Sequence, residues 1–172
     1  QMALAYFHSF DTPVAIIRPF NTYGPRQTAT AVIPTIITQI SSGVQNIKLG
    51  STTPTRDFNY IEDTIRGFIS VAESDFSVGE IINIGSGYEI SIEDTVKCIS
   101  ELMQKPVNII HEDNRTRPQN SEINRLIANN RKALEMLNWA PHYSGIEGLK
   151  RGLHYTINWF SNPDNLVHYK RD

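Results

Sequence analysis

Residues 13–26, which read PVAIIRPFNTYGPR, give the strongest indication of fold class in this chain. Residues 14–17 form an uninterrupted apolar run, which is typical of a strand covered on both faces of a sheet. The run stops at Arg18, and a polar stretch with a Gly-Pro turn follows. We therefore expect a buried strand of a parallel sheet, with polar groups gathered just beyond its carboxyl end.

Short apolar strands alternate with amphipathic helices along the rest of the chain. Strands are expected at 46–49, 58–61, 80–84 and 107–110, and helices at 1–10, 30–42 and 62–74, after Ser91, after Asn130, and from Ser144 to about Phe160. This alternation predicts an α/β fold. Only 14–17 and 81–84 are apolar enough for the centre of a parallel sheet, so we expect them to be the last strands of a larger doubly wound sheet.

Three helix starts carry capping signals. Ser91 with Asp94 and Ser144 with Glu147 have the spacing of capping boxes, and Asn130 is expected to cap a short helix. Residues 1–10 have no such signal, so we interpret them as the tail of a helix that begins upstream.

Composition restricts the function classes. Sixteen basic and eighteen acidic residues leave a net charge of −2, which provides no broad attraction for nucleic acid or anionic lipid. Cys98 is the one cysteine and is expected to fill the core, and the five histidines lack metal-ligand spacing. No apolar run is long enough to span a membrane, and we expect a soluble, cytoplasmic protein.

The polar group after the first strand, Arg18 to Asn21, is the first candidate site. Ligands of open α/β sheets sit beyond the carboxyl ends of the strands. An Asn side chain both donates and accepts, which suits a phosphate oxygen or a sugar hydroxyl. The alternative is a plain turn, because Asn, Gly and Pro are common turn formers.

Two arginine-containing segments are further candidates. Arg56 could clamp a diphosphate through its planar fork, with Asp57 holding the guanidinium in place; the alternative is a weak surface ion pair. Residues 114–118 (NRTRP), followed by Glu122, could bind phosphate and ribose hydroxyls together, or could be a solvated polar loop. Gly85-Ser86-Gly87 is only a weak phosphate-cradle signal, since the third glycine of the dinucleotide fingerprint is absent.

Taken in order, these motifs resemble a known family. R-P-F-N-x-Y-G-P-R, V-I-P, R-D-F-x-Y-I-E-D, N-I-G-S-G and R-P-x-x-S-E resemble the C-terminal portion of the extended short-chain dehydrogenases, the NAD-dependent nucleotide-sugar epimerases and 4,6-dehydratases. The resemblance reaches to about Phe160 and is greatest to the UDP- or dTDP-linked 4,6-dehydratases. It implies the end of a Rossmann-like doubly wound sheet plus a small substrate-binding α/β subdomain.

The resemblance also implies roles for individual residues. Rossmann-derived segments would be about 1–30 and 57–100, and substrate-binding segments about 31–56 and 101–172. The NAD cofactor would meet Pro19 and Phe20. The nucleotide-diphosphate sugar would meet Asn21, Ala31, Val32, Ile47, Leu49, Arg56, Asn83, Arg117 and Glu122.

The chain departs from the family in what it lacks. The glycine-rich NAD fingerprint is absent. The Tyr-x-x-x-Lys motif, in which tyrosine is the general base, is absent too, because Tyr6 and Tyr23 have no lysine four residues later. We therefore expect no catalytic residue here, NAD bound mainly by an N-terminal part, and no turnover by these 172 residues alone. The parent would be a homodimer and this portion would self-associate. The alternative is a non-catalytic nucleotide-sensing or protein-interaction module of the same fold.

Overall fold

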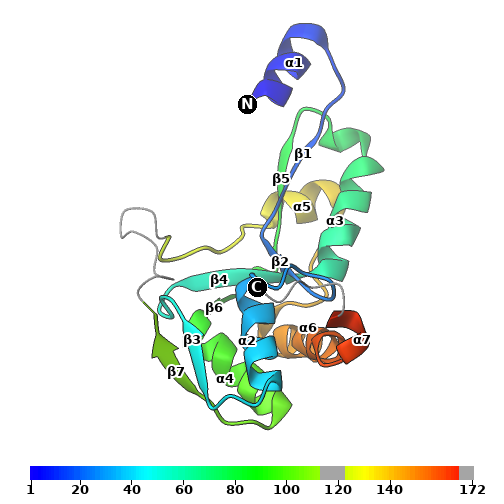
Figure 1. The fold of residues 1–172 in the computed structure, drawn as a ribbon. Helices are drawn as coiled ribbons and strands as arrows, with labels where there is room; N and C mark the ends of the chain where they lie inside the picture. The colour runs from blue at the N-terminus through cyan, green and yellow to red at the C-terminus, as the bar shows by residue number, and fades with distance from the viewer. Residues whose placement is uncertain (113–122, 167–172) are drawn as a thin grey trace.

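The computed structural model describes residues 1–112 and 123–166 (Figure 1). The elements in chain order are α1 (Met2–Phe10), β1 (Ile16–Pro19), β2 (Asn21–Tyr23), α2 (Val32–Ser41), β3 (Asn46–Leu49), β4 (Thr55–Tyr60), α3 (Ile61–Ala72), η1 (Asp75–Ser77), β5 (Ile81–Ile84), β6 (Glu89–Ser91), α4 (Ile92–Met103), β7 (Asn108–His111), α5 (Arg131–Leu137), α6 (Gly145–Phe160) and α7 (Pro163–Leu166). None of the helices in these residues is long and apolar enough to cross a lipid bilayer.

The strands form three small sheets, and the predicted α/β class is confirmed. The two strands that we expected to be central, β1 and β5, pair in parallel, with Ile16 opposite Ile81. β4 lies between β2, which is parallel to it, and β6, which is antiparallel. β3 and β7 form the third, parallel sheet. In Figure 1, β1 and β5 lie below α1 in the upper part of the molecule, and β3 and β7 lie at the lower left.

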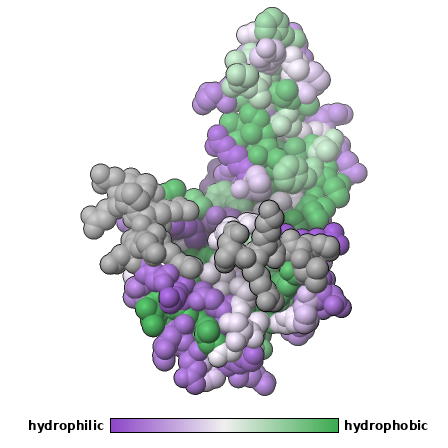
Figure 2. Space-filling model, in the orientation of Figure 1, coloured by the Kyte–Doolittle hydropathy of each residue, from purple (hydrophilic) through white to green (hydrophobic). Residues whose placement is uncertain are grey.

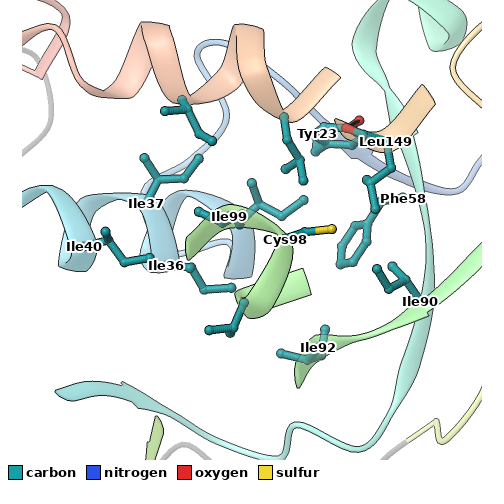
Figure 3. Close-up of a cluster of buried hydrophobic side chains, with 14 of the residues drawn as sticks. Tyr23, Ile36, Ile37, Ile40, Phe58, Ile90, Ile92, Cys98, Ile99 and Leu149 are labelled. Carbon is teal, nitrogen blue, oxygen red and sulfur yellow. Dashed lines mark hydrogen bonds between the residues drawn. The ribbon is translucent and has the colours of Figure 1, made fainter. Parts of the chain in front are cut away.

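The main hydrophobic core lies in what we call the lower body, formed by α2, β3, β4, β6, α4 and α6. Helix α2 buries isoleucines at helical spacing, and α4 and α6 face it with stripes of their own (Figure 3). Cys98 is part of this core, as predicted. The buried members are Tyr23, Ile33, Ile36, Ile37, Ile40, Ile47, Leu49, Phe58, Tyr60, Ile90, Ile92, Val96, Cys98, Ile99, Leu149, Leu153, Ile157 and Phe160.

A smaller core lies in what we call the upper sheet, β1 and β5 with α3 and α5. Val71 of α3 and Ala133 of α5 pack with Ile82, Ile84 and Trp139. These contacts cover one face of the strand pair. The opposite face carries Ile16, Arg18, Ile81 and Asn83, which are half-buried or exposed, and α1 buries none of its residues.

Of the three predicted side-chain caps, one is confirmed and two are wrong. Ser91 caps α4 as expected, because its Oγ accepts the Asp94 N–H at 2.9 Å. The box at Ser144 is wrong, since its hydroxyl donates to the Ser86 carbonyl at 2.7 Å and makes no cap bond. The cap by the Asn130 side chain is also wrong. Its amide pairs with both backbone groups of Gly85, at 2.7 and 3.1 Å, because that tertiary contact satisfies two polar groups at once.

Candidate functional site

A cavity of about 450 Å³ opens between the start of α2, the end of β3 and the middle of β4. Its size falls within the range of small-molecule sites. Apolar and polar groups both line it: Asn21, Gln27, Thr30, Ala31, Val32, Thr35, Leu49, Gly50, Ser51, Arg56, Phe58 and Ile92. The structure thus brings together five residues predicted from the sequence, namely Asn21, Ala31, Val32, Leu49 and Arg56.

Strand pairing places the carboxamide of Asn21. Residues 21–23 belong to the polar stretch that follows the first expected strand, and they form β2, whose first residue is paired in register with Phe58 of β4. The Asn21 side chain donates to the Asp57 carbonyl at 3.4 Å. A strand this short shows no hydrophobic periodicity in the sequence, and its pairing with β4 helps to stabilise it.

The start of α2 forms the second wall. Ala31 is the N-cap residue and Val32 the first helical residue. The loop before them is held by Gln27, whose side-chain amide donates to the Thr22 carbonyl at 2.9 Å. It is also held by Thr35, whose hydroxyl donates to the Ala29 carbonyl at 3.0 Å. These bonds make the cavity edge an ordered part of the fold.

The guanidinium of Arg56 forms the charged end of the site. Its Nη1 donates to the Thr55 carbonyl at 2.8 Å and to the Ile123 carbonyl at 2.6 Å. Nearby, Arg125 forms an ion pair with Glu89 at 2.6 Å. Hydrogen bonds from Arg125 and from Thr55 hold the pKa of the Glu89 carboxyl below its usual value.

Asp57 does not hold the Arg56 side chain, so that prediction is wrong. Its carboxylate is fully buried on the other side of β4 and accepts hydrogen bonds from backbone and hydroxyl donors. Side chains alternate between the two faces of a strand, so neighbours such as Arg56 and Asp57 point apart. Two of these donors are the N–H groups of Ser86 and Gly87. The possible phosphate cradle therefore already holds an anion, which is Asp57.

The remaining predicted residues do not line the cavity or lie outside the described residues. Pro19 is exposed at the end of β1, and the Phe20 N–H donates to the Ile84 carbonyl at 2.8 Å. Ile47 is fully buried in the lower body, and Asn83 is half-buried on the open face of the upper sheet. Arg117, Glu122 and the rest of the 114–118 motif lie outside the described residues.

Sequence reasoning missed several cavity residues. They are Gln27, Thr30, Thr35, Gly50, Ser51, Phe58 and Ile92. Gly50 and Ser51 directly follow β3, so the rule that ligands bind beyond strand ends could have suggested them. Phe58 follows Asp57 in the second arginine motif but has no chemistry of its own, and the remaining residues come from the loop before α2, from α2 and from α4, which meet only in the fold.

The arrangement suits one chemical class of ligand. Arg56 offers charge-assisted donors, Asn21 offers both a donor and an acceptor, and Val32, Leu49, Phe58 and Ile92 provide apolar surface. An anion attached to a flat, partly apolar group would satisfy all three. Within the described residues, no group of His, Cys, Asp and Glu side chains could hold a metal ion.

Comparison with proteins of known sequence identifies relatives. A UDP-N-acetyl-alpha-D-glucosaminuronate decarboxylase of Bacillus cytotoxicus is 34% identical over 158 residues, which is 89% of this chain and 48% of the relative. The dTDP-D-glucose 4,6-dehydratase of Homo sapiens is 30% identical over 161 residues, 91% of this chain and 44% of the relative. The chain thus spans about half the length of these curated relatives.

Solved structures share the fold. The dTDP-glucose 4,6-dehydratase of Bacillus anthracis in complex with NAD superposes with a TM-score of 0.83 at 27% identity, covering 95% of this chain and 49% of that chain. The UDP-glucuronic acid 4-epimerase of Bacillus cereus in complex with UDP-glucuronic acid and NAD gives 0.82 at 29% identity, covering 92% and 48%.

A protein-family model described as GDP-mannose 4,6 dehydratase matches residues 1–152, most of the chain. This match agrees with the relatives, the solved structures and the ordered motifs. The chain therefore belongs to the GDP-mannose 4,6-dehydratase family, within the NAD-dependent epimerases and dehydratases of the extended short-chain dehydrogenase class.

Proposed function

We propose that the cavity binds the nucleoside and diphosphate of a nucleotide-diphosphate sugar, and that the whole protein is an NAD-dependent nucleotide-sugar 4,6-dehydratase or 4-epimerase. One observation carries the proposal. Asn21, Ala31, Val32, Leu49 and Arg56 are far apart in sequence, were predicted from motifs to bind such a ligand, and line one cavity. The relative named as dTDP-D-glucose 4,6-dehydratase and the solved UDP-glucuronic acid 4-epimerase support the same class.

Each wall of the cavity has a part in this proposal. Arg56 binds the diphosphate, because a guanidinium donates two parallel hydrogen bonds to phosphate oxygens. Asn21 binds a phosphate oxygen or a sugar hydroxyl. Val32 and Leu49 cover the base. Arg117 and Glu122, predicted as the second diphosphate arginine and the ribose contact, stay part of the proposal.

Bound NAD would supply the redox chemistry of this reaction: it would accept the C4 hydride of the sugar while the tyrosine base takes the proton of the C4 hydroxyl. A dehydratase would then eliminate water across C5–C6 and return the hydride to C6, whereas an epimerase would return it to the other face of C4. Pro19 and Phe20 would lie under the nicotinamide. We place the tyrosine base, its lysine and most of the NAD site on polypeptide outside these 172 residues, so this chain contributes binding and orientation.

Calorimetric titration with UDP and with dTDP tests the binding step. We expect saturable binding of at least one of them and weaker binding of uridine or thymidine. Because one charged hydrogen-bonding group contributes about 1.5–3 kcal/mol, Arg56→Ala should weaken the affinity by roughly 10- to 100-fold. Arg131→Ala is the matched control, since that arginine lies on α5 away from the cavity and is 81% exposed. Unchanged affinity in Arg56→Ala would contradict the assignment.

A turnover assay tests whether the catalytic residues lie outside these 172 residues. The purified 172-residue chain, supplied with NAD and UDP- or dTDP-glucose, should give neither a 4-keto sugar nor the C4 epimer. Robust turnover would show that a base lies within this chain and would overturn the placement of the catalytic residues elsewhere.

A further inference from the structure

A buried carboxylate with no role in the proposed chemistry lies directly behind the cavity. Asp57 is 0% exposed and follows Arg56 on β4. Its Oδ1 accepts from the Ser86 N–H and the Ser86 hydroxyl, both at 2.7 Å. Its Oδ2 accepts from the N–H groups of Gly87 at 3.0 Å and Ala128 at 2.9 Å. A buried charge is tolerated when several donors surround it in this way.

The last of these donors belongs to residues 123–128, which we call the return segment. This segment runs beside β4: the Thr55 N–H donates to the Asn124 carbonyl at 2.9 Å, and the Leu126 N–H donates to the Thr55 carbonyl at 3.2 Å. At its start, the Ile123 carbonyl accepts from Arg56 Nη1 at 2.6 Å. Asp57 therefore holds one end of a segment whose other end holds the cavity arginine.

We propose that Asp57 is a positioning residue for the cavity. Its buried carboxylate holds the return segment against β4, and the return segment in turn fixes the position of the Arg56 guanidinium. Only the UDP-binding test of this inference depends on the proposed function. Asp57 contacts no ligand in this scheme and acts through residues 123–128.

The chemistry requires an anion at this place. An Asn side chain would turn an NH₂ group toward N–H donors and leave at least one of them unsatisfied. The site is also tightly packed, because a Cβ on Gly85 would come within 2.4 Å of the Ala128 Cβ and 3.1 Å of Asp57 Oδ2. A small carboxylate such as formate could fill the space that Asp57→Ala vacates and accept the same hydrogen bonds.

The binding test compares two buried carboxylates. Asp63 is the matched control: it is also 0% exposed and accepts the N–H groups of His142 at 2.9 Å and Tyr143 at 2.8 Å, but it lies outside the cavity wall. At a temperature where both variants are folded, Asp57→Asn should weaken UDP binding about tenfold or more, because it misplaces a charged donor. Asp63→Asn should change it less than about twofold. Equal affinities of Asp57→Asn and wild type would overturn the proposal.

Hydrogen exchange, measured without any nucleotide, tests whether Asp57 holds the return segment against β4. In Asp57→Ala, the amides of Leu126 and Ala128 should lose protection, and sodium formate should restore it where sodium chloride of equal ionic strength does not. Ser86→Ala, a milder change that keeps the backbone donors, should give a smaller loss in the same amides. Unchanged protection in these variants would refute the claim that Asp57 holds the return segment in place. If wild type binds neither UDP nor dTDP, the proposed function fails while this measurement still decides the role of Asp57.

Discussion

The lower body and the upper sheet use similar residues but complete their packing to different degrees. In the lower body, α2, α4 and α6 enclose one apolar core, and its strands carry buried side chains toward it. In the upper sheet, α3 and α5 cover one face of β1 and β5, and the other face stays partly open. Figure 2 shows hydrophobic residues gathered over the upper part, where Figure 1 places α1, β1, β5 and α3.

This difference shows which part of the fold is complete in itself. Helix α3 carries an apolar stripe, Ile65, Phe68 and Ile69, in which each residue is about half exposed, whereas the side that it buries holds Asp63, Thr64, Gly67 and Val71. An exposed apolar stripe of this kind favours contact with another surface. The cavity lies on the lower body, so the binding surface is built on the part that encloses the larger core. Substitutions in the two parts should therefore differ in their effect on stability.

The largest effect is expected from shortening a core side chain of the lower body. Leu153 of α6 is 0% exposed, so Leu153→Ala should lower the free energy of unfolding by about 3–4 kcal/mol through lost burial and a cavity. Ile65→Ala on α3 removes a side chain that is 50% exposed and should cost less than about 1 kcal/mol. Urea denaturation of both variants measures this. Equal losses would show that the stripe on α3 is as well packed as the core.

A second pair of substitutions adds a methyl group instead. A Cβ at Gly152 of α6 would lie 2.2 Å from the Tyr23 hydroxyl and 2.9 Å from the Tyr60 ring, both within the enclosed core. Gly152→Ala should therefore destabilise by about 2 kcal/mol, as overpacking commonly does. It should also disturb the Tyr23 hydrogen bond to the Leu149 carbonyl, which is 3.2 Å.

Gly67 of α3 is the counterpart in the upper sheet. A Cβ there would lie 2.8 to 3.0 Å from the side chain of Ile84, which is buried in the smaller core. Gly67→Ala should cost about 1 kcal/mol, less than Gly152→Ala, because the closest approach is longer and the gain in helix propensity is the same in both helices. Thermal unfolding compares the two. A greater loss for Gly67→Ala would mean that the upper sheet is as rigid as the lower body.

The exposed stripe on α3 predicts association between copies of this chain. Light scattering over a concentration series should show species larger than the monomer, because contiguous apolar surface favours contact. Phe68→Glu should shift the population toward the monomer while changing stability by less than about 0.5 kcal/mol, as surface substitutions usually do. Glu73→Gln, at the exposed end of the same helix, is the control. A monodisperse wild-type monomer would contradict the prediction.

Sequence patterns predicted most helices and the longer strands, because their periodicity is local. They missed β2 and β6, which are three residues long and each bury one apolar side chain, Tyr23 or Ile90, so that neither shows a hydrophobic period before it pairs with β4. They placed the helix starts at Ser144 and Asn130 correctly, but the side chains of these residues bond to Ser86 and Gly85 and make no cap hydrogen bond. A capping motif cannot reveal a competing partner more than forty residues away.

The site residues also separate into those that a local motif predicted and those that only the fold brings together. Asn21 and Arg56 were predicted because each stands in a motif with a stated chemistry. Asp57 stands in the same motif as Arg56, yet its partners come from the turn after β5 and from Ala128, so its role needed the fold. Thr35 and Ile92 line the cavity only because α2 and α4 pack beside β4.

The smallest effect concerns the ion pair that joins β6 of the lower body to the return segment. Arg125 and Thr55 hold the pKa of Glu89 below its ordinary value of 4.5, so the pair stabilises the fold above that pH and the contribution is lost as the pH falls further. Glu89→Gln should therefore lower Tm slightly at neutral pH, and the difference from wild type should shrink toward zero well below pH 4.5.

High salt should reduce the neutral-pH difference in the same direction, since exposed pairs are screened. Glu135→Gln is the control, because its pair with Arg131 is longer, at 3.4 Å, and more exposed. If the Tm difference for Glu89→Gln were the same at every pH, the contact would act through packing and not through charge. The lower body would then need no electrostatic link to hold residues 123–128 in place.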